Sequence, residues 1–189
     1  MLLSLGIAHA AVPIEEPGVR AMAEALAHID RDYDTVVGAR CGSVRKPKQL
    51  VWILAIQSEM NRAESFRMLR IITQLKTDDV YVDGVLRNHA FTSDTPGNLR
   101  EALMSGITAL ERERYRLIDA SKHVAGQAGR IDKGYRPKTK PQEWCERSFK
   151  AAKNSIAKSM ITEMEHMSAI GSLQKQFEAE LAKLAKEKK

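Results

Sequence analysis

A chain of 189 residues is long enough to bury a hydrophobic core without help from disulfides or metal ions. Hydrophobic residues make up 43% of it and aromatic residues 5%, which argues against general disorder and favours helices over a β-rich fold. The net charge is +6, and the longest apolar run, residues 50–56, is far shorter than the roughly 20 residues that span a membrane.

The N-terminal part predicts one helix after an apolar start. Residues 1–10 resemble a secretory signal and end in an A-x-A pattern at Ala10, but no basic residue precedes the apolar run. We therefore expect a tail that packs on the body rather than a processed signal, although the sequence leaves this open. Pro17 then opens a predicted helix over residues 17–32, with Val19, Met22 and Leu26 on one face.

The middle of the chain predicts a second helical region over residues 47–76, opened by Pro47. Asn61 and Glu64 have the spacing of a capping box, which would divide this region into two helices. Residues 77–90 combine a Thr77 cap with a run of β-branched residues. Helix and strand both remain open there, and we favour a short helix.

Two long helices are predicted in the second half, at about 96–128 and 141–186. Pro96 and Pro141 supply their starts, and Gly126 and Gly129 supply the end of the first. Apolar residues recur at alternating steps of four and three along both helices, which is typical of helix pairing. On the second helix this seam consists of Ile156, Met160, Met167, Ile170, Phe177, Leu181 and Leu184.

These elements predict an all-α bundle of about five or six helices. Its expected divisions are a helical core domain (1–129), a basic loop (130–140) and a long C-terminal helix (141–189). At 1.5 Å per residue that last helix is about 70 Å long, so we expect its end to extend from the body. We also expect its seam to support self-association into a homo-oligomer, in the manner of a coiled coil.

The two cysteines, Cys41 and Cys145, are more than a hundred positions apart and have no metal-ligand spacing. We expect two buried free thiols in a reducing, intracellular or cytoplasmic setting, although one long-range disulfide remains an alternative.

Motifs for catalysis or for binding a metal or cofactor are incomplete throughout the sequence. The acidic run that begins at Asp30 lacks the glycine and the glutamate of a calcium loop. Glu163 and His166 have the Glu-x-x-His spacing of di-iron bundles, but no second copy exists. The glycine pair at residues 38 and 42 lacks the spacing of a phosphate loop and has no strand before it. We expect no enzyme activity, no metal and no cofactor.

The positive charge is confined to the last third of the chain. Residues 1–129 hold sixteen basic and sixteen acidic residues, so the whole surplus belongs to residues 130–189. Nine basic residues and three acidic ones lie between positions 130 and 158. The basic ones are Arg130, Lys133, Arg136, Lys138, Lys140, Arg147, Lys150, Lys153 and Lys158.

Such a concentration attracts polyanions, because neutralised phosphates release their condensed counterions. Tyr135 and Trp144 lie within it and offer rings for base stacking. In the alternative, Trp144 and Phe149 belong to the core and the lysines are merely solvated. A helix-turn-helix over residues 63–89 is a weaker hypothesis, since two aspartates begin its second helix.

The sequence therefore predicts a non-enzymatic, oligomeric helical protein that binds DNA or RNA through these nine residues. The alternative is a structural component of a virion or other large assembly, which docks through the long C-terminal helix. In that case the basic stretch meets acidic protein surface instead of nucleic acid.

Overall fold

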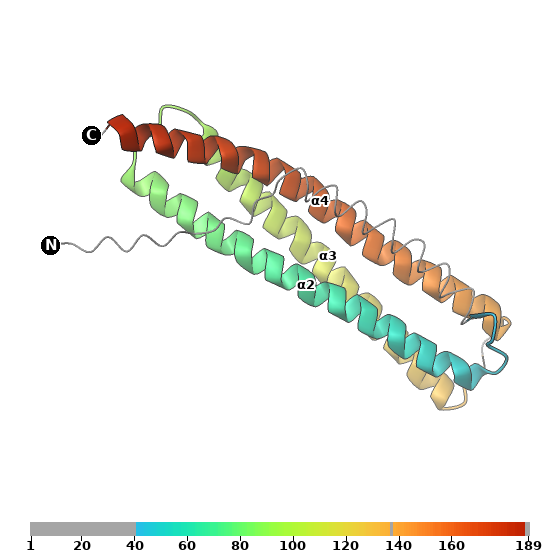
Figure 1. The fold of residues 1–189 in the computed structure, drawn as a ribbon. Coiled ribbons are helices and arrows are strands. Elements are labelled where there is room, and N and C mark those ends of the chain that lie inside the picture. Colours follow the sequence, from blue (N-terminus) through green and yellow to red (C-terminus); the bar gives the residue numbers. More distant parts are fainter. Residues whose placement is uncertain (1–40, 137, 188–189) are drawn as a thin grey trace.

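The computed structural model describes residues 41–136 and 138–187 of the chain. Three long helices account for most of them: α2 (Pro47–Asn88), α3 (Thr95–Asp132) and α4 (Pro141–Glu187). They run antiparallel in chain order and lie side by side as an elongated bundle (Figure 1). The described residues contain no strand, which confirms the all-α prediction. The predicted helix at 17–32 and the predicted tail at 1–10 lie outside them.

The expected five or six helices are wrong for the described part of the chain, because α2 is one helix of 42 residues. Asn61 does not cap a new helix: it is buried, and its amide donates to the Gln57 carbonyl one turn back, at 3.2 Å. The Thr77 hydroxyl likewise donates to the Thr73 carbonyl at 3.1 Å. Both candidate caps therefore bond within a continuing helix. Residues 77–88 are helical, as favoured, but as the last turns of α2.

Proline begins all three helices, as the sequence predicts. Pro47 and Pro141 are first residues, and Pro96 is the second residue of α3. The missing N–H of proline costs nothing in a first turn, where it has no helical acceptor. In addition, the Gln49 side chain accepts bonds from the N–H groups of Arg45 and Lys46, at 2.8 and 2.9 Å.

The bundle core has two apolar clusters. The larger lies toward the α2–α3 turn and includes Met68, Leu103, Leu110 and Ile170. The smaller lies at the opposite end, where α2 and α4 begin, and includes Leu50, Ile131 and Phe149. The predicted seam of α3 is confirmed, because Leu99, Leu103, Gly106, Leu110 and Leu117 are all buried.

Polar side chains occupy the middle of the bundle, between these clusters. Gln57, Ser58 and Asn61 are buried on α2, and the Ser58 hydroxyl lies 2.9 Å from the Ser121 hydroxyl of α3. Nearby, Arg67 bridges Glu64 and the buried Glu163 of α4. The hydrogen bonds that Arg67 donates to Glu64 and Glu163 raise the pKa of its guanidinium, although partial burial opposes this.

The expectation that the end of the last helix extends from the body is wrong at least as far as Leu181. Buried residues follow α4 from Cys145 to Phe177, and Leu181 still packs against the larger cluster. The α2–α3 turn is tied to α4 there, because the Ser93 hydroxyl donates to the Glu180 carboxylate at 2.6 Å. A 47-residue helix fits because the body is itself a rod of helices about 60 Å long, rather than a compact globule.

The predicted oligomerisation seam of α4 lies inside this bundle. Four of its residues are buried in the larger cluster, Met167 and Leu181 pack against that cluster, and Leu184 is half-buried. A dimer built on the seam would therefore require copies of the chain to exchange α4.

Candidate nucleic-acid interface

The basic segment lies at one end of the bundle, where α3 ends and α4 begins. The helix α3 runs past the predicted stop near Ala128 to Asp132, because Ile131 is a buried member of the smaller cluster. Gly134 then ends it with φ of 101°, a left-handed conformation that favours glycine. The Tyr135 N–H completes this turn by donating to the Arg130 carbonyl at 3.0 Å.

A disulfide holds the same end together. Cys41 and Cys145 are bonded and fully buried, so the expectation of two free thiols is wrong. Because α2 and α4 run parallel, the residues just before α2 meet the first turn of α4, although they are 104 positions apart. Sequence spacing carries no information about that meeting. Phe149, one turn after Cys145, is buried beside the disulfide in the smaller cluster.

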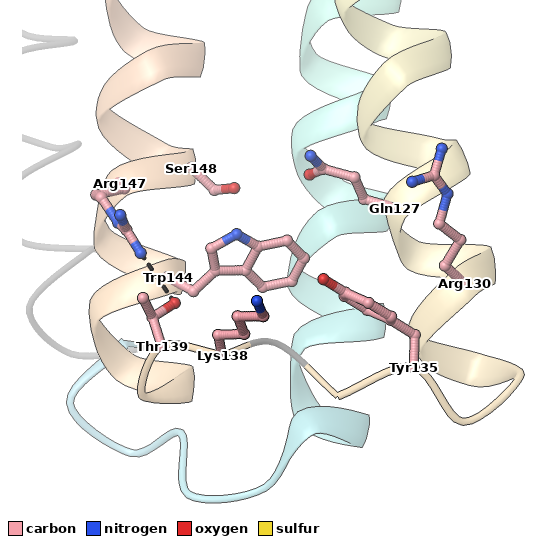
Figure 2. Close-up of a pocket in the computed structure, with 8 residues that line it drawn as sticks. All are labelled: Gln127, Arg130, Tyr135, Lys138, Thr139, Trp144, Arg147 and Ser148. Atoms are coloured by element: carbon pink, nitrogen blue, oxygen red, sulfur yellow. Dashed lines mark hydrogen bonds between the residues drawn. The ribbon is translucent and has the colours of Figure 1, made fainter.

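A pocket of about 470 Å³ opens between the end of α3, the loop and the start of α4 (Figure 2). Three basic side chains, two aromatic rings and three neutral polar side chains surround it, and no carboxylate of residues 41–136 or 138–187 lines it. They are Arg130, Lys138, Arg147, Tyr135, Trp144, Gln127, Thr139 and Ser148. The pocket therefore combines positive charge with ring surface, a pairing that suits an anion carrying an aromatic group.

Both rings line this pocket, and Trp144 also packs against the smaller cluster of the core. Trp144 is half-buried, and its backbone N–H donates to the Lys140 carbonyl at 3.1 Å in the first turn of α4. Tyr135 is 54% exposed. Figure 2 shows the Tyr135 hydroxyl directed toward the Trp144 ring from the opposite side. Cys145 and Phe149 take the buried positions on this part of α4, which leaves Trp144 facing the pocket.

Seven of the nine predicted binding residues are exposed and pair with no carboxylate among the described residues. The Arg147 guanidinium donates to the Thr139 hydroxyl at 2.9 Å, so it keeps its full charge. The other six are Arg130, Lys133, Arg136, Lys138, Lys140 and Lys150.

The remaining two are placed differently. Lys158 lies farther along α4, where its ammonium is 3.7 Å from the Glu113 carboxylate. Lys153 is half-buried and takes part in interactions of its own. The predicted face shared by Arg147, Lys150 and Lys158 therefore divides, and only its first two members belong to the cationic end.

Basic residues elsewhere on the bundle are commonly neutralised by acids of the same chain. Arg100 bridges Asp79 and Asp83 on the neighbouring helix, at 3.2 and 2.7 Å. Lys76 pairs with Glu111 at 2.7 Å. Others with a carboxylate partner are Arg62, Arg67, Arg87 and Arg116. Other exposed cations, such as Lys175 and Lys183, also lack a carboxylate partner among the described residues. The seven cations differ from these because they gather at one end of the bundle.

Three pocket residues were not predicted: Gln127, Thr139 and Ser148. Helical spacing offered a signal for two of them, because Gln127 lies three residues before Arg130 and Ser148 lies four residues after Trp144. Thr139 had no such signal, since its place depends on the path of the loop.

The other candidate sites do not assemble in the part of the chain that is described. There, no group of three His, Cys, Asp or Glu side chains is placed to hold a metal ion. Glu163 of the Glu-x-x-His motif bonds to Arg67 instead. Residues 63–88 lie within one continuous helix, so the helix-turn-helix hypothesis is wrong. None of the described helices has an apolar stretch sufficient to cross a bilayer.

Comparison of the chain with protein families, with curated proteins and with solved structures finds no match.

Proposed function

We propose that this is a non-enzymatic protein that binds nucleic acid with the cationic end of its helical bundle. The cationic end comprises Arg130, Lys133, Arg136, Lys138, Lys140, Arg147 and Lys150. One observation carries the proposal: these seven exposed side chains gather at one end of the bundle, and none of them has a carboxylate partner among the described residues. Phosphate groups spaced along a nucleic-acid backbone are the natural counter-charge for such a cluster.

The arrangement of the cations favours an extended polyanion over a single small anion. They occupy the last turns of α3, the loop and the first turns of α4, so they are spread over one end of the rod. The disulfide and the smaller cluster hold these segments together. A surface that is formed before the ligand arrives loses less conformational entropy on binding.

Two matched charge reversals test the proposal. Lys138→Glu with Lys150→Glu changes the cationic end, while Lys175→Glu with Lys183→Glu makes the same change in charge near the other end of α4. All four lysines are exposed, so both variants should unfold at the wild-type temperature. Binding of a fluorescent oligonucleotide is measured by anisotropy at about 50 mM salt.

The expected result is a loss of at least tenfold in affinity for the first variant and less than threefold for the second. Equal losses of affinity in the two variants would mean that binding depends on net charge alone, and would overturn the assignment of binding to the cationic end. A wild-type protein that binds neither DNA nor RNA at this salt concentration would remove the function.

Docking of α4 into a larger assembly and self-association both remain predictions from the sequence. Since α2 and α3 cover the α4 seam, assembly through it requires an exchanged helix. Light scattering tests self-association directly, because a monomer mass with and without oligonucleotide would contradict it. Deletion of residues 173–189 tests docking, because an unchanged assembly would contradict it.

The expected cytoplasmic location also remains a prediction, and the disulfide makes it testable. Disulfides persist in oxidising compartments and are rare in the cytosol. Alkylation of the protein in freshly lysed cells reports the state of Cys41 and Cys145. Two alkylated thiols would support the reducing location, whereas an intact disulfide would contradict it.

A further inference from the structure

The pocket offers ring contacts that the phosphate backbone of a duplex does not need. We infer that it holds one unpaired base of a single-stranded nucleic acid, stacked on Trp144, with adjacent phosphates on Lys138 and Arg147. This inference rests on the proposed function, and adds to it the class of nucleic acid that is bound.

The position of Trp144 supplies the stacking surface. The neighbouring residue, Cys145, is fixed by the disulfide, and the Trp144 backbone is bonded within the first turn of α4. The ring lines the pocket and stacks on no other ring among the described residues, and the same holds for Tyr135. An aromatic ring that is held in place but has no ring partner is the platform on which exposed bases stack.

Polar groups beside the ring supply partners for the edge of a base. The Trp144 indole N–H and the Ser148 hydroxyl make no hydrogen bond within the described structure. Gln127 uses its amide nitrogen toward His123 at 2.9 Å, which leaves its carbonyl oxygen as an acceptor. In Figure 2 the indole nitrogen of Trp144 faces the side on which Gln127 and Ser148 lie. Donors and an acceptor in one place suit a heterocyclic base better than a simple hydrocarbon ring.

The size and charge of the pocket fit one nucleotide. A volume of about 470 Å³ falls within the usual range of small-molecule sites, about 300–1,000 Å³. Lys138 and Arg147 flank the ring from the loop and from α4, so phosphates on either side of the stacked base would meet a cation. A duplex would have to unpair and unstack a base before it could make the same contact, which opposes its binding.

The chain contains only two tryptophans, so the inference has a direct optical test. Trp52→Phe leaves Trp144 as the only indole, and the variant is titrated at low salt with four ligands. These are a 12-nucleotide oligo-dT, an oligo-U of the same length, a 12-base-pair duplex and a free mononucleotide. Expected are quenching of Trp144 by at least one oligonucleotide and binding at least tenfold tighter than that of the duplex or the mononucleotide.

Ring removal provides the second readout. Tyr135→Ala and its control Tyr115→Ala both remove exposed tyrosines from the bundle surface. Trp144→Ala should weaken oligonucleotide binding about 5- to 150-fold, and Trp144→Phe should restore most of it. Tyr135→Ala should weaken binding more than threefold and Tyr115→Ala should leave it unchanged. Because Tyr135 is exposed, its test stands even where Trp144→Ala disturbs folding.

Each negative result of these titrations would overturn a different claim. Equal affinity for single strand and duplex, with no quenching, would overturn the base pocket and leave nucleic-acid binding intact. Mononucleotide affinity equal to that of the oligonucleotides would make the ligand a free nucleotide and overturn the single-strand assignment. Absence of binding to all four ligands would overturn both proposals.

Discussion

The cationic end should give binding a steep and quantifiable salt dependence. Each phosphate neutralised on a single strand contributes about −0.7 to the slope of log affinity against log salt. The three cations that line the pocket are the minimum contact set, and all seven exposed cations are the maximum. The expected slope therefore lies between about −2 and −5. Raising salt from 50 to 200 mM should then weaken binding by about 16-fold to about 1,000-fold.

Neutralisation of two lysines tests whether these cations are the ones involved. Lys138→Gln with Lys150→Gln should make the slope shallower by about 1.4, because two phosphate contacts are lost. Lys175→Gln with Lys183→Gln removes the same charge from exposed positions near the other end of α4 and should leave the slope unchanged. Anisotropy titrations at four salt concentrations measure both slopes. A wild-type slope near zero, or equal changes in the two variants, would refute the assignment.

Three further predictions concern the scaffold, and urea denaturation measures each. Reducing the disulfide, which closes a loop of 104 residues, should lower the free energy of unfolding by about 5 kcal/mol, and Cys145→Ser should have the same effect. An unchanged denaturation midpoint would mean that no disulfide is present. Gly126→Ala has open space around the new methyl group and should stabilise α3 by about 1 kcal/mol. Gly106→Leu would press on Ile170 and should destabilise the protein by about 2 kcal/mol. The opposite order of stabilities would contradict the packing of α3 on α4. Arg67→Ala leaves two mostly buried carboxylates without their cation and should lower the free energy of unfolding by about 3 kcal/mol. Arg62→Ala breaks an exposed pair and should lower it by less than about 1 kcal/mol. Similar losses of stability in the two variants would mean that the central network is not buried.

Local signals in the sequence were sufficient for the helical class and for most helix starts. Proline at the first turns marks all three helices, and the four-three spacing identified the buried faces of α3 and α4. Both signals depend only on neighbours along the chain. The concentration of basic residues was also visible, because it requires counting and no knowledge of the fold.

Long-range and ambiguous features could not be obtained in the same way. Asn61 and Thr77 are good caps in isolation, but burial and bonds to the preceding turn keep them inside α2. The length of the bundle depends on all three helices at once. The expectation that the end of α4 extends from the body was wrong because it compared α4 with a compact domain rather than with the other two helices. The disulfide and the pocket depend on the parallel course of α2 and α4, which brings Cys41 to Cys145 and leaves Trp144 facing the loop.

Lys158 shows that counting basic residues along the sequence does not tell which of them lie beside an acid in the folded bundle. Its position on α4 continues the helical spacing from Arg147, but Glu113 of α3 lies beside it in the folded bundle. Helical periodicity identifies side chains that share a face, and only the packing of helices decides which of them meet an acid. For this reason the proposal uses the seven residues of the cationic end and leaves out Lys153 and Lys158.

Lysine footprinting of the full-length protein would test the central claim most directly. Limited acylation, with and without a saturating single-stranded oligonucleotide, is read by mass spectrometry at each lysine. The account predicts protection of Lys138, Lys140 and Lys150, and unchanged reactivity of Lys175 and Lys183, which are equally exposed near the other end of α4. Uniform protection of all five, or protection of the last two alone, would contradict it.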